Sequence, residues 1–112
     1  MSIAPKQLGQ LRPANTTAAS LYSPAANKRT SILTLVVSNT TGSAAAYSLF
    51  LDDNGTTYDE TTALYFAVSL NANTTVHLDT HFYMDNSAGN LGVKTDTGSA
   101  LTFTAFGIEE DV

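Results

Sequence analysis

Three side chains capable of acid–base chemistry or metal binding, His77, Asp79 and His81, occupy alternate positions in one segment. On a helix, the spacing of the two histidines would bring both imidazoles to one metal ion. On a strand they are about 13 Å apart, at roughly 3.3 Å per residue, and cannot ligate the same ion. Apolar and polar residues alternate over 74–84, which predicts a strand. We therefore expect exposed contact residues; a ligand site completed by other strands is the alternative.

A second group of potential ligands lies in a polar segment between two apolar ones. Its members are Asp52, Asp53, Asn54, Asp59 and Glu60. Carboxylate oxygens on a flexible loop are suited to Ca²⁺. The order Asp-Asp-Asn-Gly differs from that of an EF-hand loop, however, and an Asn-Gly pair favours a tight hairpin turn. The sequence therefore predicts a solvated hairpin loop, and we expect neither a metal ion nor a cofactor.

Other catalytic chemistry has little support in this sequence. The chain has no cysteine, which excludes thiolate nucleophiles and cysteine-based zinc sites. It contains no Gly-x-Ser-x-Gly segment, phosphate-binding loop or dinucleotide fingerprint. A polysaccharide hydrolase would need a positioned pair of carboxylates, and the sequence positions none. The expectation is a protein that is not an enzyme.

The composition predicts an all-β chain. Charged residues make up 13% of the 112 residues and hydrophobic residues 43%, which also argues against a disordered acidic chain. Threonine, which favours strands, occurs 17 times, and turn-forming serine and asparagine occur 10 and 8 times. Turn signals recur about every ten residues between alternating segments. This pattern predicts one antiparallel β-sandwich of seven or eight strands with Greek-key or jelly-roll connections.

The expected sandwich occupies residues 18–112. Residues 1–17 contain two prolines and are expected to form an extended N-terminal arm, in which residues 7–11 can pair as a short edge strand. Strict alternation places Leu33, Leu35 and Val37 on one face of a central strand covered on both sides. Tyr22, Tyr58 and Tyr83 are candidates for a contact surface. The predicted strands cover 18–23, 29–39, 44–51, 63–70, 74–84, 90–95 and 100–108. Most bulky aromatic residues are expected in the core: Tyr47, Phe50, Phe66, Phe82, Phe103 and Phe106.

Charge is divided between the two halves of the chain. Residues 1–51 hold four cations and no acid, whereas residues 52–112 hold all ten acids and one lysine. Such a division of charge can orient the chain as it associates with a partner. Residues 109–111 are expected to form a solvated acidic tail. Four scattered cations do not form a nucleic-acid groove, and no apolar run is long enough to span a membrane. The N-terminus lacks the apolar region of a signal peptide, so synthesis in a cytoplasm is expected.

Several segments together resemble small β-sandwich structural proteins of tailed-bacteriophage virions. The segment 19–24 reads Ala-Ser-Leu-Tyr-Ser-Pro, and 31–42 is an alternating strand that ends in Asn-Thr-Thr-Gly. A strand with apolar residues at alternate positions follows at 45–51, and the strand at 100–108 fits the same pattern. The resemblance extends over roughly residues 8–108 and rests on strand and turn motifs.

The resemblance implies a virion protein assembled in the host cytoplasm, without enzymatic activity. It would most simply be a head-decoration (cement) protein that forms homotrimers and binds the major capsid protein or other virion proteins, not nucleic acid or membrane. The arm would make the contacts, and deleting residues 1–15 would abolish binding and leave the sandwich folded. The expected arm contacts are Ile3, Lys6, Leu8, Leu11 and Arg12.

The alternative is a fibre or tail-tip module that binds a host receptor or glycan. Its contact surface would be a patch of exposed tyrosine, aspartate and histidine side chains. Tyr58 and His81 are the residues whose substitution would test that alternative.

Overall fold

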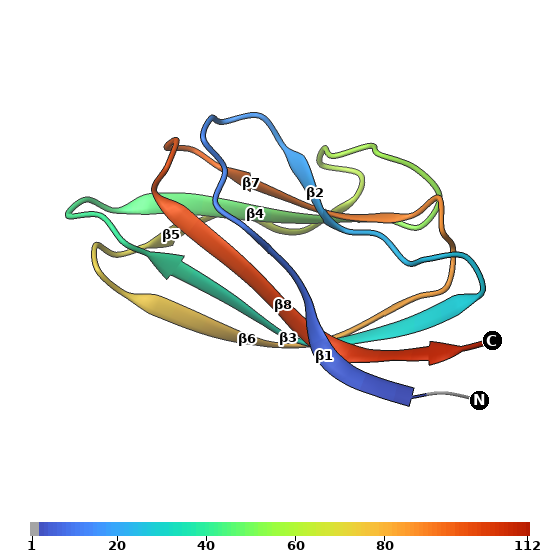
Figure 1. Cartoon of the computed structure of the whole chain (residues 1–112). Coiled ribbons are helices and arrows are strands. Elements are labelled where there is room, and N and C mark those ends of the chain that lie inside the picture. The colour runs from blue at the N-terminus through green and yellow to red at the C-terminus, as the bar shows by residue number, and fades with distance from the viewer. Residues whose placement is uncertain (1–2) are drawn as a thin grey trace.

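The structure is a computed structural model that describes residues 3–112 (Figure 1). These residues form eight β-strands, joined by turns and loops, and contain no helix. The all-β prediction is confirmed, and most strands lie close to their predicted ranges. Residues 3–112 contain no helix that is both long and apolar enough to cross a membrane. In chain order the strands are β1 (Ile3–Leu11), β2 (Ala19–Tyr22), β3 (Lys28–Asn39), β4 (Ala45–Asp52), β5 (Ala63–Leu70), β6 (Thr75–Met84), β7 (Asn90–Thr95) and β8 (Leu101–Asp111).

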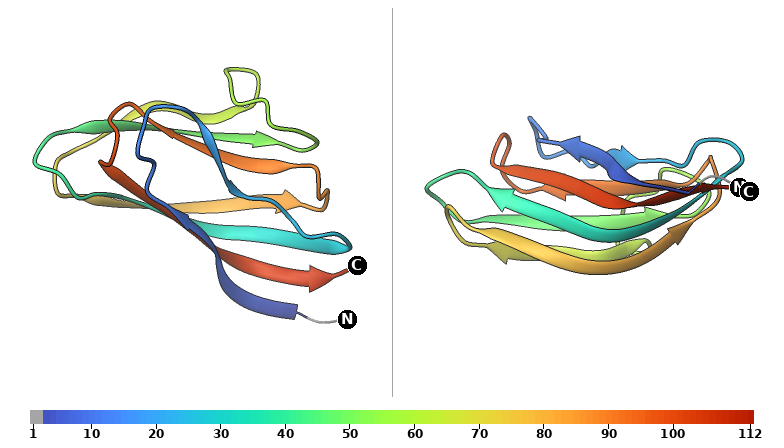
Figure 2. Two further views of the ribbon diagram at one scale, coloured as in Figure 1. Left: turned by 45° about the horizontal axis from the view of Figure 1, so that its top comes forward. Right: turned by 60° about the horizontal axis from the view of Figure 1, so that its bottom comes forward.

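The strands form two four-stranded antiparallel sheets that pack as a sandwich (Figure 1, Figure 2). Sheet A has the order β1-β8-β3-β6, and sheet B has the order β2-β7-β4-β5. The first strand thus pairs with the last, the second with the seventh, the third with the sixth and the fourth with the fifth. A long hairpin wrapped around a core gives this order, which is that of a jelly roll. The sandwich prediction is confirmed.

The core lies between the sheets because each strand turns alternate side chains inward. Both inner strands of sheet A, β3 and β8, and both inner strands of sheet B, β4 and β7, supply fully buried residues. These are Ile32, Leu35, Val37, Leu49, Leu91, Val93, Leu101 and Phe103, all 0% exposed.

An irregularity in β3 changes the predicted facing of its residues. The register against both neighbours shifts between Ile32 and Thr34, so Ile32 faces inward before the shift and Leu35 faces inward after it. One extra residue in a strand reverses the alternation beyond it. The prediction that Leu33 shares a face with Leu35 is therefore wrong, since Leu33 is half-buried on the outer face of sheet A. The buried Thr80 hydroxyl donates to the Ile32 carbonyl at 2.7 Å and satisfies that acceptor at the irregularity.

The N-terminal segment, predicted as an extended arm over residues 1–17, contains the edge strand β1. It pairs with β8 from Ile3 opposite Glu110 to Leu11 opposite Phe103. Residues 3–11 therefore complete sheet A rather than project from it. The physical reason is that β8 offers a free edge of matching length, while Leu8 and Leu11 pack against the core. Met1 and Ser2 lie outside the described residues.

The basic and acidic halves of the chain meet along this part of sheet A. Lys6 pairs with Glu109 at 3.2 Å, Arg29 pairs with Glu110 at 2.7 Å, and Lys28 pairs with Asp111. The predicted solvated tail, residues 109–111, is instead the end of β8. Three of the four N-terminal cations thus bind acids of their own chain, which leaves less charge to steer an association.

Candidate interaction face

Strand β6 presents the acid–base side chains that the sequence singles out. His77, Asp79 and His81 are exposed on the outer face of sheet A, as the alternation predicts. Among residues 3–112, no three histidine, cysteine, aspartate or glutamate side chains gather where they could hold one metal ion. The exposure of the three residues agrees with the alternation, and their role as contact residues stays a prediction. The alternate residues turn toward the core and are buried or half-buried: Val76, Leu78, Thr80, Phe82 and Met84.

A shallow depression of about 450 Å³ lies on the same outer face, between β1 and β3. Phe106 in its lining is 40% exposed, because Phe103 and Ala105 take the inward positions of β8. Gly107 permits the close approach of β8 and β3 beside it, since a Cβ at this position would lie 2.0 Å from the Ser31 carbonyl oxygen and 3.0 Å from the core-packed Leu8 side chain. The depression is lined by Pro5, Lys6, Gln7, Leu33, Thr34, Phe106, Gly107 and Ile108.

Part of the N-terminal contact set predicted from the sequence is occupied within this chain. Leu8 and Leu11 are half-buried against the core. Ile3 takes part in β1 through its backbone, and its side chain lies outside the described residues. Leu8 and Leu11 therefore stabilise the sandwich and leave little of their own side-chain surface for a partner.

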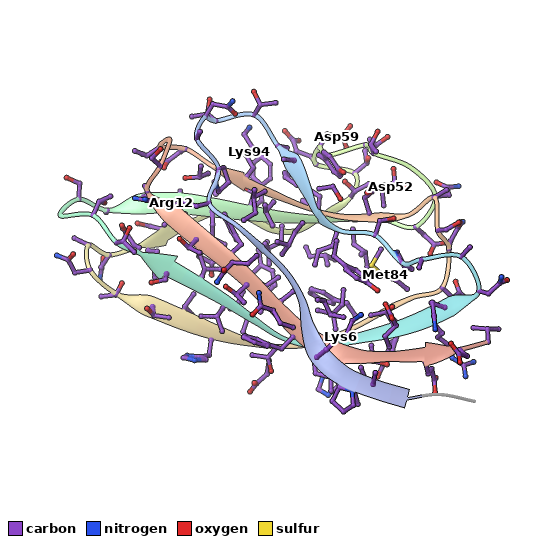
Figure 3. All side chains as sticks on the ribbon, viewed as in Figure 1. Lys6, Arg12, Asp52, Asp59, Met84 and Lys94 are labelled. Carbon is purple, nitrogen blue, oxygen red and sulfur yellow. The ribbon has the colours of Figure 1, made fainter. Side chains whose placement is uncertain are left out.

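The two cations of this segment, Lys6 and Arg12, are labelled in Figure 3 and are exposed. Both form hydrogen bonds within the chain. Lys6 forms its ion pair with Glu109 and also lines the depression. The Arg12 guanidinium donates to the Ser99 carbonyl and, at 3.3 Å, to the Thr40 hydroxyl. Exposed pairs of this kind contribute little to stability, and contact of Lys6 and Arg12 with a partner stays a prediction.

Tyr22 and Tyr58, predicted as contact residues, are also engaged within the chain. The Tyr22 hydroxyl donates to the Glu109 carboxylate at 3.1 Å and accepts from the Thr30 hydroxyl at 2.7 Å, and burial is the main cause that raises the pKa of Tyr22. The Tyr58 ring packs so closely on Gly92 that a Cβ there would lie 2.5 Å from ring carbons. Its buried hydroxyl has no hydrogen-bond partner among residues 3–112. Neither ring is a free platform for a glycan.

The Tyr58 ring also fixes the loop between β4 and β5 over sheet B. It lies 6.1 Å from the ring of Phe50, a residue that is 1% exposed. Phe50 is thus buried as predicted, but under this loop on the outer face of sheet B. The loop therefore forms a small second apolar cluster outside the main core.

The carboxylates of this loop bind its own backbone. Asp52 accepts hydrogen bonds from the backbone N–H groups of Thr57 at 2.9 Å and Asn54 at 3.1 Å, which lower its pKa. Asp59 accepts from the hydroxyl and the backbone N–H of Thr61, and these bonds lower its pKa as well. The loop thus uses its acids to order a turn, as expected for a hairpin loop.

These hydrogen bonds predict a loop that loosens in acid. They favour the ionised form of Asp52, so the stability that they contribute is full above the ordinary pKa of that group. It is lost as the pH falls through the lowered pKa of the folded state. We expect the Asn54 and Thr57 amide signals in NMR spectra to shift together below about pH 4, near the ordinary aspartate pKa. In Asp52→Asn the acid-dependent change should be absent. Asp53→Asn should keep it, because the Asp53 side chain makes no hydrogen bond to the part of the chain that the structure describes.

Strand β5 carries three exposed apolar residues that were not predicted, and the bulge at Ala67 sets the third of them, Val68, on the opposite face from the first two. Leu64, Phe66 and Val68 are 44%, 52% and 36% exposed. The prediction that Phe66 and Phe106 lie in the core is wrong, because both belong to the outward positions of their strands. Tyr47 and Phe103 are buried as predicted, and Phe82 is half-buried. No local signal marks this exposure, since the uncharged run 61–76 resembles the uncharged run 30–51, which supplies much of the core.

Comparison with known proteins gives a fold relationship. The sequence matches no family model and no curated protein. The structure is similar to a chain of the infectious bursal disease virus T13 viral particle, with a TM-score of 0.53 and 14% identity. That match covers 96% of this chain and 30% of the viral chain, so this chain spans less than a third of its neighbour. A chain from the Gx strain of the virus matches with a TM-score of 0.49 and 15% identity, over 95% of this chain and 29% of the viral chain. A chain from the Gt strain matches with a TM-score of 0.44 and 15% identity, over 96% of this chain and 29% of the viral chain.

Proposed function

We propose that this chain is a non-enzymatic structural protein of a tailed-bacteriophage virion, and that it decorates the capsid. The observation that carries the proposal is the likeness of nearly the whole chain to part of a viral-particle chain. The strand and turn motifs of residues 19–24 and 31–42 support the bacteriophage assignment by resemblance. A jelly roll is a fold that viral capsid domains use repeatedly.

The proposed action is adhesion. A decoration protein binds many equivalent positions on a shell, so modest contacts are multiplied by the symmetry of the particle. A surface of short polar side chains loses little conformational entropy on contact. No chemical step is required, which agrees with the carboxylates of residues 52–60 being used to order a loop.

The outer face of sheet A is the proposed contact with the capsid protein. It combines an apolar depression around Phe106 with the exposed polar row His77, Asp79 and His81. An apolar centre with a polar rim is the usual anatomy of a protein interface. In this arrangement the N-terminal segment contributes Pro5 and Lys6 as a wall of the depression.

Particles made by a phage that lacks this gene provide the test. We expect the purified chain to bind them saturably and to co-sediment with them. Phe106→Glu should weaken binding by about tenfold or more, since it places a charge in the centre of the contact. Val112→Glu is the matched control, because Val112 is a 76% exposed apolar residue away from the depression and should bind normally.

Binding can be quantified from the protein left in the supernatant over a concentration series. Failure of the wild-type chain to sediment with the particles would refute the virion role. Equal binding of wild type and Phe106→Glu would refute the proposed face alone.

A further inference from the structure

We infer that Asn54 is a site of spontaneous deamidation, and that its modification releases the loop between β4 and β5 from the outer face of sheet B. The inference concerns the chemistry of this chain alone and does not depend on the virion role. The loop covers residues 53–62. It contains Asn54 and Gly55, the only Asn-Gly pair in the sequence.

The reaction needs only water besides these two residues. The main-chain nitrogen of Gly55 attacks the side-chain carbonyl carbon of Asn54, so that a C–N bond forms. The side-chain nitrogen leaves as ammonia and takes up the proton that the glycine nitrogen loses. Water then opens the resulting succinimide ring: attack at the side-chain carbonyl gives aspartate, and attack at the main-chain carbonyl gives isoaspartate. In isoaspartate the main chain runs through Cβ and Cγ, so it is longer by one carbon atom.

The glycine makes Asn54 the most reactive asparagine of this chain. The attacking nitrogen belongs to the following residue, and a Cβ on that residue would hinder its approach. The Asn54 side chain is exposed and makes no hydrogen bond to any of residues 3–112, so it can turn toward the Gly55 nitrogen. The Asn71 side chain is exposed and unbonded to the same described residues, but alanine follows it.

Other asparagines are held by hydrogen bonds of their side chains. Asn39 is 2% exposed, and its side-chain nitrogen donates to the carbonyls of Ser43 at 2.9 Å and Leu70 at 3.2 Å. The Asn90 side chain donates to the Gly55 carbonyl at 2.9 Å. A side chain held in this way must give up its hydrogen bonds before it can close the ring.

The turn around Asn54 leaves no room for a longer main chain. The Asp52 carboxylate accepts hydrogen bonds from the N–H groups of Asn54 at 3.1 Å and Thr57 at 2.9 Å. Gly89 lies so close to this turn that a Cβ on it would be 2.6 Å from the Asp53 carbonyl oxygen. An added carbon atom within the turn cannot keep all these contacts, so the isoaspartate form loses the turn.

Tyr58 is the side chain that the loss of the turn releases. Its ring packs on Gly92 and lies 6.1 Å from the ring of Phe50. Its buried hydroxyl has no hydrogen-bond partner in the part of the chain that the structure describes, and a buried hydroxyl without a partner is destabilising. Once the turn no longer holds the loop, Tyr58 gains hydrogen bonds to water by leaving, and Phe50 is uncovered.

Ageing of the purified chain at physiological temperature in mildly alkaline buffer tests the inference. We expect Asn54 to convert over days, with the gain in mass that replacement of NH₂ by OH produces. Peptide mass spectrometry locates the change, and enzymatic methylation of isoaspartate distinguishes the two products. Gly55→Ala should convert about tenfold more slowly or less, because its Cβ shields the attacking nitrogen. Asn71 in the same sample is the matched control and should stay unmodified.

Hydrogen exchange of the separated products tests the release of the loop. The Thr57 amide should exchange about tenfold faster or more in the isoaspartate form than in the fresh chain, since its bond to Asp52 is lost. Asn54→Asp adds the same charge on a main chain of normal length and should keep the slow exchange. Equal exchange of the Thr57 amide in these two forms would overturn the inference.

The ageing experiment can overturn the inference as well. An Asn54 side chain that stays unmodified would do so, as would a Gly55→Ala variant that converts as fast as the wild type. Conversion of Asn71 at the rate of Asn54 would show that the glycine does not select the site.

Discussion

Removal of residues 1–11 is expected to lower the free energy of unfolding by on the order of 4 kcal/mol. The truncation takes away β1, which pairs with β8 over its whole length and packs Leu8 and Leu11 on the core. A fully buried leucine contributes about 1.5–3 kcal/mol, and these two are half-buried. The loss of strand pairing along β8 adds to that loss and uncovers the edge beside Phe103. Since small domains are stable by only about 5–15 kcal/mol, the truncated chain should be largely unfolded on mild heating.

Urea unfolding followed by circular dichroism measures this effect. The double variant Leu8→Ala/Leu11→Ala should account for much of the loss, and Gln7→Ala, at an exposed position of the same strand, should change little. If the truncated chain unfolded at the wild-type urea concentration, β1 would be a dispensable arm. The expectation drawn from the sequence, that residues 1–15 can be deleted without loss of the fold, would then hold.

Phe103→Ala is expected to cost about 3–5 kcal/mol, the usual range for emptying a fully buried phenylalanine site. Phe103 is 0% exposed on β8, which lies between β1 and β3 in sheet A. The cavity would open between the sheets, where neither sheet can collapse without breaking strand pairing. Phe106→Ala, three residues along the same strand, should cost less than about 1 kcal/mol because its side chain is 40% exposed.

Comparison of the two phenylalanines checks which face of β8 is buried. Equal losses for both variants would show that the alternation along β8 is not as described. A larger loss for Phe106→Ala would place the core on the opposite face.

The fold was largely predictable because strand alternation is a local property. The β6 segment shows it clearly, and His77, Asp79 and His81 are exposed as the sequence predicts. The reversal at Leu33 was not predictable in the same way. It depends on the register of β3 against two neighbouring strands, which no local pattern records.

The contact surfaces were less predictable than the fold, since they depend on which partner each strand finds. Lys6 lies in a basic half of the sequence, yet it meets Glu109, over a hundred residues away, because β1 and β8 pair. Leu64 and Phe66 lie in the part of β5 that alternates, before the bulge at Ala67. Their exposure follows from the position of β5 at the end of sheet B, which is a property of the topology.

Cryo-electron microscopy of the phage particles with and without this protein tests the virion role most directly. We predict that wild-type particles carry extra density on the outside of the shell, into which the two four-stranded sheets fit with sheet A facing the capsid protein. This density should be absent from particles of a gene-deletion phage and should return when the purified chain is added. Maps of the two particles that are identical over head, neck and tail would contradict a structural role in the virion.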